Sequence, residues 1–160
     1  MKTLVRNQPP DADYFITAAT YRCRPILLDD VSLFFDSWPT IDLKAWVLFR
    51  DHFHAILNAG NRDIFALVHR FRATYSMSSR QRGNGSCFWQ CQFWCHRIVD
   101  DRDFLRHLDY IHFNPVYHDL CRNPFEYPFS SLTRWYRKGV YPRDWGRIEV
   151  PECVGYFGEW

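Results

Sequence analysis

The sequence predicts an α+β domain with a ferredoxin-like antiparallel sheet that carries its helices on one face. Three observations support this prediction. Short runs rich in β-branched and aromatic residues are typical of strands, and two longer segments repeat apolar residues at helical spacing. These segments alternate in the order β-α-β-β-α-β-α. With 160 residues, the length predicts a single domain over 1–160, with a core at about 14–113 and a basic, aromatic-rich extension at 115–160.

The element boundaries follow from local sequence signals. Strands are expected at 14–21, 43–49, 52–57 and 88–99, and helices at 29–37, at 62–77 and from residue 100 onward. Asn61 and Asp100 are the expected N-caps, and Arg50 with Asp51 forms a tight hairpin turn. Residues 80–86 are expected to be a flexible loop. The apolar stripe of the last long helix comprises Phe104, Leu105, Leu108 and Ile111.

Composition excludes several classes of protein. The chain is 47% hydrophobic and 24% charged, which is an ordinary globular balance. It contains no apolar run near the roughly 20 residues that span a bilayer, and residues 1–10 show no signal peptide. Six cysteines without these export signals predict a reduced, cytoplasmic protein. Cys87, Cys91 and Cys95 form no CxxC pair, so a zinc site with His96 remains a minor alternative.

The charge distribution is more informative than the net charge of +2. Residues 62–82 carry five arginines against one aspartate, and residues 122–147 carry six basic residues against two acidic ones. Two such segments could follow a phosphate backbone, or they could be ordinary solvated surfaces. Aromatic residues make up 19% of the chain and could fill a core or stack on bases.

The His52-Phe53-His54 segment is the first candidate for chemistry. Residues i and i+2 of a strand point to the same side, so both imidazoles could share a divalent metal ion. Two structural histidines are the alternative reading of this pair.

Tyr110 and Asn114 form the second candidate, because residues four apart are neighbours on a helix. Tyr110 falls on a polar strip with Asp103, Arg106 and His107, away from the apolar stripe. This placement favours a phenol that points into a polar site over one that packs in a half-buried position. Pro115 disfavours helical geometry at Asn114, so the helix is least certain there.

Together these residues suggest phosphoryl-transfer chemistry. His52, His54 and Asn114 could hold Mg²⁺ or Mn²⁺ through nitrogen and oxygen ligands. Such an ion would polarise a phosphate, and the Tyr110 oxygen would attack it to give a phosphotyrosine. A phenol, with a pKa near 10, needs a nearby cation to act at neutral pH.

The chain resembles the REP-associated tyrosine transposases, within the HUH single-strand transposases. The resemblance covers about 14–146 and is strongest in Ala45–Leu57 (AWVLFRDHFHAIL), Leu108–Val116 (LDYIHFNPV) and Gly139–Gly146 (GVYPRDWG). It implies a ferredoxin-like HUH nuclease domain with the catalytic tyrosine on a late helix. It also implies cleavage and rejoining of single-stranded DNA at hairpin-forming palindromes through a 5′-phosphotyrosine. On this chain Tyr110 resembles the nucleophile, and His52, His54 and Asn114 resemble the metal ligands.

The chain departs from the family pattern at several positions, among them Cys95, which follows Trp94 where the family commonly has a glutamate. Phe49-Arg50-Asp51 replaces Met-Pro-Asn or Met-Pro-Asp, Tyr117 replaces a lysine, and Asp119 replaces a glycine. A non-glycine residue at position 119 is strained if its φ is positive. These departures motivate an alternative function, which is a domesticated DNA-binding protein without cleavage activity.

The implied partners are single-stranded or hairpin DNA, bound in a bacterial cytoplasm by a monomer or homodimer without a membrane. The candidate DNA contacts are Arg22, Arg24, Arg70, Arg72, Arg97 and Arg106, each of which could equally be a surface residue. A replication initiator or relaxase would use the same chemistry, but such proteins usually carry further domains, for which 160 residues leave no room.

Overall fold

The structure, a computed structural model, describes residues 9–83, 89–147 and 150–151. In chain order, its helices and strands are β1 (Asp13–Ala19), α1 (Val31–Asp36), β2 (Asp42–Leu48), β3 (His52–Asn58), α2 (Ile64–Gln81), β4 (Trp94–Arg97), α3 (Asp101–Tyr117) and α4 (Leu132–Arg137). Short 3-10 turns lie at Tyr21–Cys23 and Pro124–Glu126. The predicted α+β order is therefore confirmed.

The chain divides into two compact units. The first unit comprises Met1–Lys44 and Leu48–Ile98, and the second comprises Ala45–Val47 and Val99–Trp160. The description of 1–160 as one domain stays a prediction.

The sheet has four strands in the order β2-β3-β1-β4. β1 runs antiparallel to both β3 and β4, with Thr17 opposite His54 and Ala19 opposite His52. This is the ferredoxin-like topology that the sequence predicted. The arrangement makes β3 a central strand, so its side chains are held by pairing on both edges.

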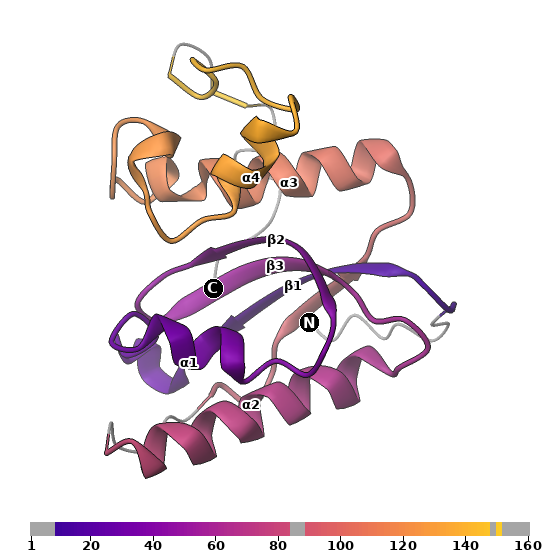
Figure 1. Cartoon of the computed structure of the whole chain (residues 1–160), viewed down its shortest axis with the longest axis vertical. Coiled ribbons are helices and arrows are strands. Elements are labelled where there is room, and N and C mark those ends of the chain that lie inside the picture. The colour runs from indigo at the N-terminus through magenta and orange to yellow at the C-terminus, as the bar shows by residue number, and fades with distance from the viewer. Residues whose placement is uncertain (1–8, 84–88, 148–149, 152–160) are drawn as a thin grey trace. The chain divides into compact units, whose positions relative to one another are not determined.

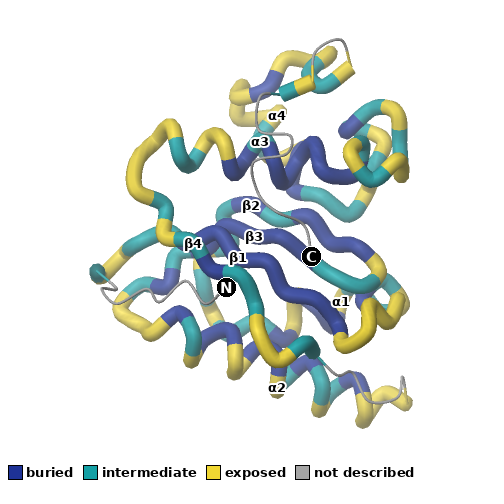
Figure 2. Tube along the Cα trace, turned by 180° about the vertical axis from the view of Figure 1, so that it is seen from behind, coloured by how far each residue is buried: buried dark blue, intermediate teal, exposed yellow. Residues whose placement is uncertain are grey.

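Helices α1 and α2 lie along one side of this sheet (Figure 1). The Phe53 ring of β3 packs edge-on against Phe34 of α1 at 5.0 Å and against Phe71 of α2 at 5.5 Å. Because side chains alternate along a strand, His52 and His54 occupy the opposite side of the sheet from these helices. The prediction of helices on one face is thus confirmed within the first unit, and Figure 2 shows β1 and β3 as mostly buried.

The predicted boundaries of α2 and β4 need correction. Asp63, not Asn61, caps α2, because its carboxylate accepts the Ala66 N–H at 2.7 Å. The helix continues to Gln81, so the expected loop begins later than residue 80, and positions 84–86 lie outside the described residues. The expected strand at 88–99 shortens to Trp94–Arg97, while Trp89 forms only an isolated bridge to Thr20 and residue 88 is not described.

Helix α3 begins where the sequence predicted, directly after the cap at Asp100. The Asp100 carboxylate accepts the Asp103 N–H at 2.8 Å, and the helix continues through Pro115 to Tyr117. Asn114, where the sequence left the helix least certain, lies within it. A proline only biases the preceding residue away from helical geometry, and the buried run around it holds the helix. Leu105 is 47% exposed and so does not belong to the apolar stripe, whereas Leu108 and Ile111 are fully buried.

The second unit also includes the middle of β2, which pairs with the segment before α4. The Trp46 N–H donates to the Ser131 hydroxyl, and the Ser131 N–H donates to the Trp46 carbonyl, each at 2.9 Å. Gly146, in the same unit, has a φ of 74°, and a Cβ at this position would lie 2.7 Å from the Pro124 ring. This position therefore favours glycine. Within the described residues, no helix combines the length and apolarity that a membrane crossing needs.

Candidate active site

His52 and His54 lie side by side on β3. Their ring centroids are 5.2 Å apart, and the ring planes meet at 75°. The His52 side chain is 20% exposed, whereas His54 is buried. The strand therefore directs both imidazoles to one side of the sheet, as the i, i+2 spacing predicted.

Asp51 fixes the tautomer of His52. The Asp51 carboxylate lies 2.7 Å from Nδ1 of His52, and a carboxylate can only accept, so Nδ1 carries the proton. Nε2 of the neutral ring is then the nitrogen with a lone pair. Phe49 stacks on the His52 ring at 4.4 Å and holds its plane. A histidine oriented by a carboxylate in this way is the usual arrangement of a metal ligand.

Thr17 engages His54 from the neighbouring strand, through a hydroxyl that can either donate to Nδ1 or accept from it. Its hydroxyl lies 2.7 Å from Nδ1 of His54, and both groups are buried. The Phe15 ring of β1 stacks against the His54 ring, with the centroids 5.9 Å apart and the planes at 10°. Nδ1 is thereby engaged within the sheet, and Nε2 is the nitrogen that His54 would offer to an ion.

The spacing of the two rings fits a shared ion. Two imidazoles that bind one metal at about 2.1 Å, with an angle of about 90–110° between them, hold their centroids roughly 4.6–5.3 Å apart. The observed 5.2 Å falls in this range. The spacing of the two rings is therefore compatible with one shared divalent cation.

Tyr110 and Asn114 lie on α3 and are both buried, with 6% and 1% of their surface exposed. The sequence placed Tyr110 on a polar strip, and the burial of this strip is mixed, since His107 is 1% exposed, Asp103 is half-buried and Arg106 is exposed. Neither amide atom of the Asn114 side chain has a hydrogen-bond partner among the described residues. A buried amide without partners is costly, so the amide oxygen suits a ligand that the chain does not itself supply.

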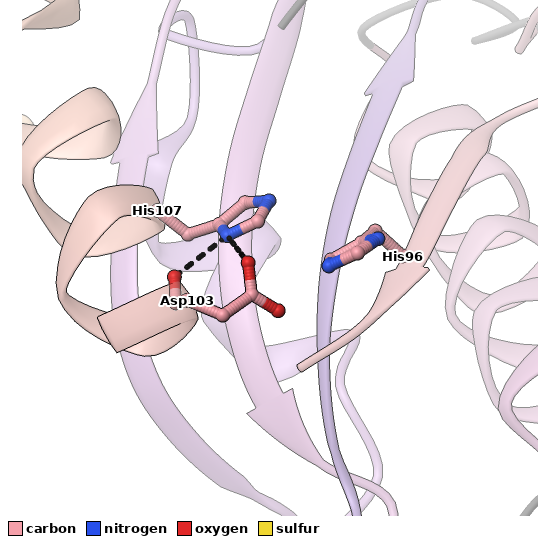
Figure 3. A group of neighbouring side chains, drawn as sticks. All are labelled: His96, Asp103 and His107. Carbon is pink, nitrogen blue, oxygen red and sulfur yellow. Dashed lines mark hydrogen bonds and ion pairs between the residues drawn. The ribbon is translucent and has the colours of Figure 1, made fainter. Parts of the chain in front are cut away.

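A further histidine on α3 is held by an aspartate one turn earlier (Figure 3). Nδ1 of His107 lies 2.8 Å from the Asp103 carbonyl oxygen and 3.1 Å from its carboxylate. Both acceptors place the proton on Nδ1. The i, i+4 spacing of this pair is visible in the sequence, but no role was predicted for it.

His112, by contrast, is engaged at both ring nitrogens. Nδ1 lies 3.0 Å from the Tyr141 hydroxyl, which donates to the Asp109 carboxylate at 3.0 Å, so Nδ1–H is the donor to Tyr141. Nε2 then accepts from the Ser131 hydroxyl at 2.8 Å. Each hydrogen-bonding group of the imidazole has a partner within the second unit, so His112 has a structural role.

Burial reinforces this arrangement. Desolvation, together with the positive charge of Arg134, lowers the pKa of His112 to about 3, so the ring stays neutral. Burial also raises the pKa of Asp109, and its hydrogen bond from Tyr141 partly offsets that rise. The neutral ring is the form that can donate from one nitrogen while accepting at the other.

The predicted DNA-contacting arginines differ in exposure. Arg72 is buried, donates to the Gln90 carbonyl and lies 5.8 Å from the Trp89 ring, so it supports the packing of the first unit. The other five are exposed: Arg22, Arg24, Arg70, Arg97 and Arg106. As DNA contacts, all six stay predictions.

Thr17 and Asp51 are the contributors that the sequence analysis missed. Asp51 directly precedes His52, and an acidic neighbour of a candidate ligand is a signal that could have been used. Thr17 is 37 residues from His54 and meets it only through strand register. No local pattern in the sequence marks that contact.

These features define a ferredoxin-like α+β domain with paired histidines on a central strand, the architecture expected from the resemblance to HUH proteins. No protein-family model matches the chain. The chain is 31% identical over 106 residues to the REP-associated tyrosine transposase of Escherichia coli (strain K12), which covers 65% of this chain and 62% of that protein. It is 44% identical over 68 residues to a putative REP-associated tyrosine transposase of Haemophilus influenzae. This match covers 42% of this chain and 39% of that protein.

A solved structure shows the same fold over nearly the whole length. The structure of a REP-associated tyrosine transposase bound to a REP hairpin superposes with a TM-score of 0.79 at 24% identity, covering 95% of this chain and 94% of that one. Each sequence match spans less than two thirds of the relative's length. The chain is a relative of the REP-associated tyrosine transposases, and the resemblance predicted from its motifs is confirmed.

Proposed function

We propose that this chain is a metal-dependent single-strand DNA transposase or endonuclease that cleaves and rejoins DNA at hairpin-forming palindromes. The observation that carries the proposal is the His52–His54 pair, with each Nδ1 engaged by a neighbouring side chain and the rings 5.2 Å apart. The names of the relatives and the hairpin bound by the solved neighbour support the choice of DNA as substrate.

Tyr110 is the nucleophile in this proposal. Its phenol oxygen loses its proton and attacks the phosphorus, forming a bond between Oη and phosphorus as the bond to the 3′ oxygen breaks. The 3′ oxygen takes up a proton and leaves as a hydroxyl, while the 5′ phosphate stays on the enzyme. Attack by a 3′ hydroxyl on this phosphotyrosine rejoins a strand, so no nucleotide cofactor is consumed.

His52, His54 and Asn114 would hold the Mg²⁺ or Mn²⁺ ion. When bound, the ion would supply charge that polarises the phosphate and favours the phenolate. Asp51 and Thr17 would keep each imidazole in the tautomer and orientation that ligation needs. The unpartnered Asn114 amide supports its place in this set.

The exposed arginines would contact the phosphates of a hairpin or its single-stranded flank, which leaves Arg72 as the least suited of the six. The proposed setting is the bacterial cytoplasm, with the chain acting as a monomer or homodimer.

The test is covalent capture of DNA. The protein is incubated with Mn²⁺ and a hairpin carrying a single-stranded tail, labelled at either end, and then denatured and run on a gel. We expect an adduct that retains only the label on the 3′ side of the cut. Tyr110→Phe should give none, while Tyr136→Phe, a matched exposed tyrosine, should behave as the parent. An equal adduct with Tyr110→Phe would remove Tyr110 from its role.

A second candidate function is hairpin binding without cleavage. Asp119, just beyond α3, has a φ of 56°, so the strain expected of a non-glycine residue there is present in the backbone. Tight hairpin binding that neither Mg²⁺ nor Mn²⁺ converts into an adduct would favour this function over the first.

A further inference from the structure

The loop that follows β1 is strained and exposed. Arg22 has a φ of 55° and Cys23 a φ of 52°, although neither residue is glycine. Left-handed backbone in such residues costs free energy and persists only where neighbouring structure imposes it. Such strain concentrates at functional positions, and here it lies within the exposed run 21–25.

Thr20 imposes this conformation. It is fully buried, its N–H donates to the Asp51 carbonyl at 2.7 Å, and its hydroxyl lies within hydrogen-bond distance of the Arg24 and Asp51 carbonyls. The Cys23 N–H closes the turn by donating back to the Thr20 carbonyl at 3.1 Å. The loop is thus hydrogen-bonded to Asp51, the residue whose carboxylate orients His52.

Strand register places the loop beside the histidine pair. Ala19, the last residue of β1, is the partner of His52, and Tyr21 follows two residues later. The loop and the β3 histidines therefore lie at one end of the sheet within the first unit.

Tyr21 presents an aromatic surface at this place. Tyr21 is 46% exposed, and the Arg22 guanidinium lies over its ring, 5.3 Å from the ring centroid. Because the Tyr21 ring is exposed, packing of this ring contributes little to the stability of the fold. A ring with an adjacent cation is the combination that single-strand binding proteins use to hold a base and its phosphate.

We propose that Tyr21 is a stacking platform for one base of the single-stranded DNA next to the cleaved phosphate, with Arg22 beside it as a phosphate contact. This inference rests on the proposed function and adds to it a residue that reads the unpaired strand. The strained turn would serve to hold the ring rigidly in the orientation that stacking requires.

The experiment measures binding to a hairpin DNA with a single-stranded tail, in which one tail base at a time is replaced by an abasic site. The Tyr110→Phe protein is the parent, so that the DNA stays intact. We expect one abasic position to weaken binding by about 5- to 150-fold. Tyr21→Ala should weaken binding of intact DNA by a similar factor. In this variant, the abasic site at the sensitive tail position should weaken binding no further.

Two control variants separate stacking from folding. Tyr21→Phe keeps the ring and should bind as the parent, and Phe35→Ala removes an exposed aromatic of α1 and should have no effect. The inference is overturned if Tyr21→Ala binds intact DNA as tightly as the parent, or if it retains the full abasic penalty. A parent that binds none of these DNAs would instead contradict the proposed function.

Discussion

Two buried histidines, His54 in the first unit and His112 in the second, are held in different ways. In the first unit, His54 has Nδ1 bonded to Thr17 across the sheet, at 2.7 Å. In the second unit, His112 is bonded at both ring nitrogens, to Tyr141 and Ser131. Both residues are almost fully buried, so burial does not distinguish them. The comparison teaches that partners at both ring nitrogens, as His112 has, indicate a structural role that burial alone does not reveal.

The largest expected effect on cleavage comes from replacing a proposed metal ligand, His52, and it contrasts with replacement of the structural His112. His52→Ala should lower Mn²⁺-dependent cleavage by at least about 100-fold, because a metal ligand matters more than the groups that orient it. His112→Gln should leave the Mn²⁺ concentration needed for half-maximal cleavage unchanged and lower the free energy of unfolding by about 1–3 kcal/mol. Cleavage assays over a Mn²⁺ series and urea denaturation measure both quantities. A shift in Mn²⁺ dependence with His112→Gln alone would reverse the comparison.

A smaller effect is expected from the residue that orients His54. Thr17→Val keeps the shape of the side chain but removes the hydroxyl at Nδ1, so Mn²⁺ affinity should fall about 10- to 100-fold. The free Mn²⁺ signal in electron paramagnetic resonance measures this affinity without DNA. Thr133→Val, an exposed position on α4, is the matched control and should leave affinity unaltered. Equal affinities for the two variants would mean that Thr17 orients no ligand.

The pH dependence of stability should reveal His112. Its pKa of about 3 lies below the ordinary value of 6.5, so the unfolded chain binds the proton more readily. Its stabilising contribution is complete above about pH 6.5 and is lost as the pH falls toward 3. Between pH 7 and pH 5 the loss is about 2 kcal/mol.

Denaturation at several pH values checks this, with His112→Gln as the reference chain. The raised pKa of Asp109 acts in the opposite direction, because its contribution weakens as the pH rises. Subtracting the His112→Gln curve removes the effects common to both chains. Identical slopes for the two chains would mean that His112 is not held neutral.

The smallest expected effect concerns the backbone after α3. Asp119→Gly should raise the free energy of unfolding by up to about 1 kcal/mol, because glycine relieves the strain at a φ of 56° but gains entropy in the unfolded chain. Asp144→Gly, at a described position without positive φ, should lower it instead. Thermal denaturation of the two variants compares them, and a destabilised Asp119→Gly would show that the aspartate makes a compensating contact.

Much of the fold could be predicted because its signals are local. Strand and helix periodicities specify the element order, and the i, i+2 rule alone places His52 and His54 on one side of β3. The cap at Asp100 was also visible in the sequence. These features depend on residues close together in the sequence, so they can be predicted without knowledge of tertiary packing.

The remaining features depend on contacts between distant residues. The Thr17–His54 bond requires strand register, and the burial of Tyr110 requires packing that helical periodicity does not contain. The continuation of α3 through Pro115 arises in the same way, since tertiary packing overrides a local preference. The sequence therefore indicated which residues to examine, but not which groups orient them.

The central claim is that Tyr110 becomes covalently bonded to DNA while the β3 histidines support the reaction. The most direct measurement is mass spectrometry of peptides from the protein–DNA adduct formed with Mn²⁺. We expect the nucleotide mass on the peptide that contains Tyr110, and at least about 100-fold less adduct from His52→Ala. A nucleotide on any other tyrosine, or a full yield of adduct from His52→Ala, would contradict the account.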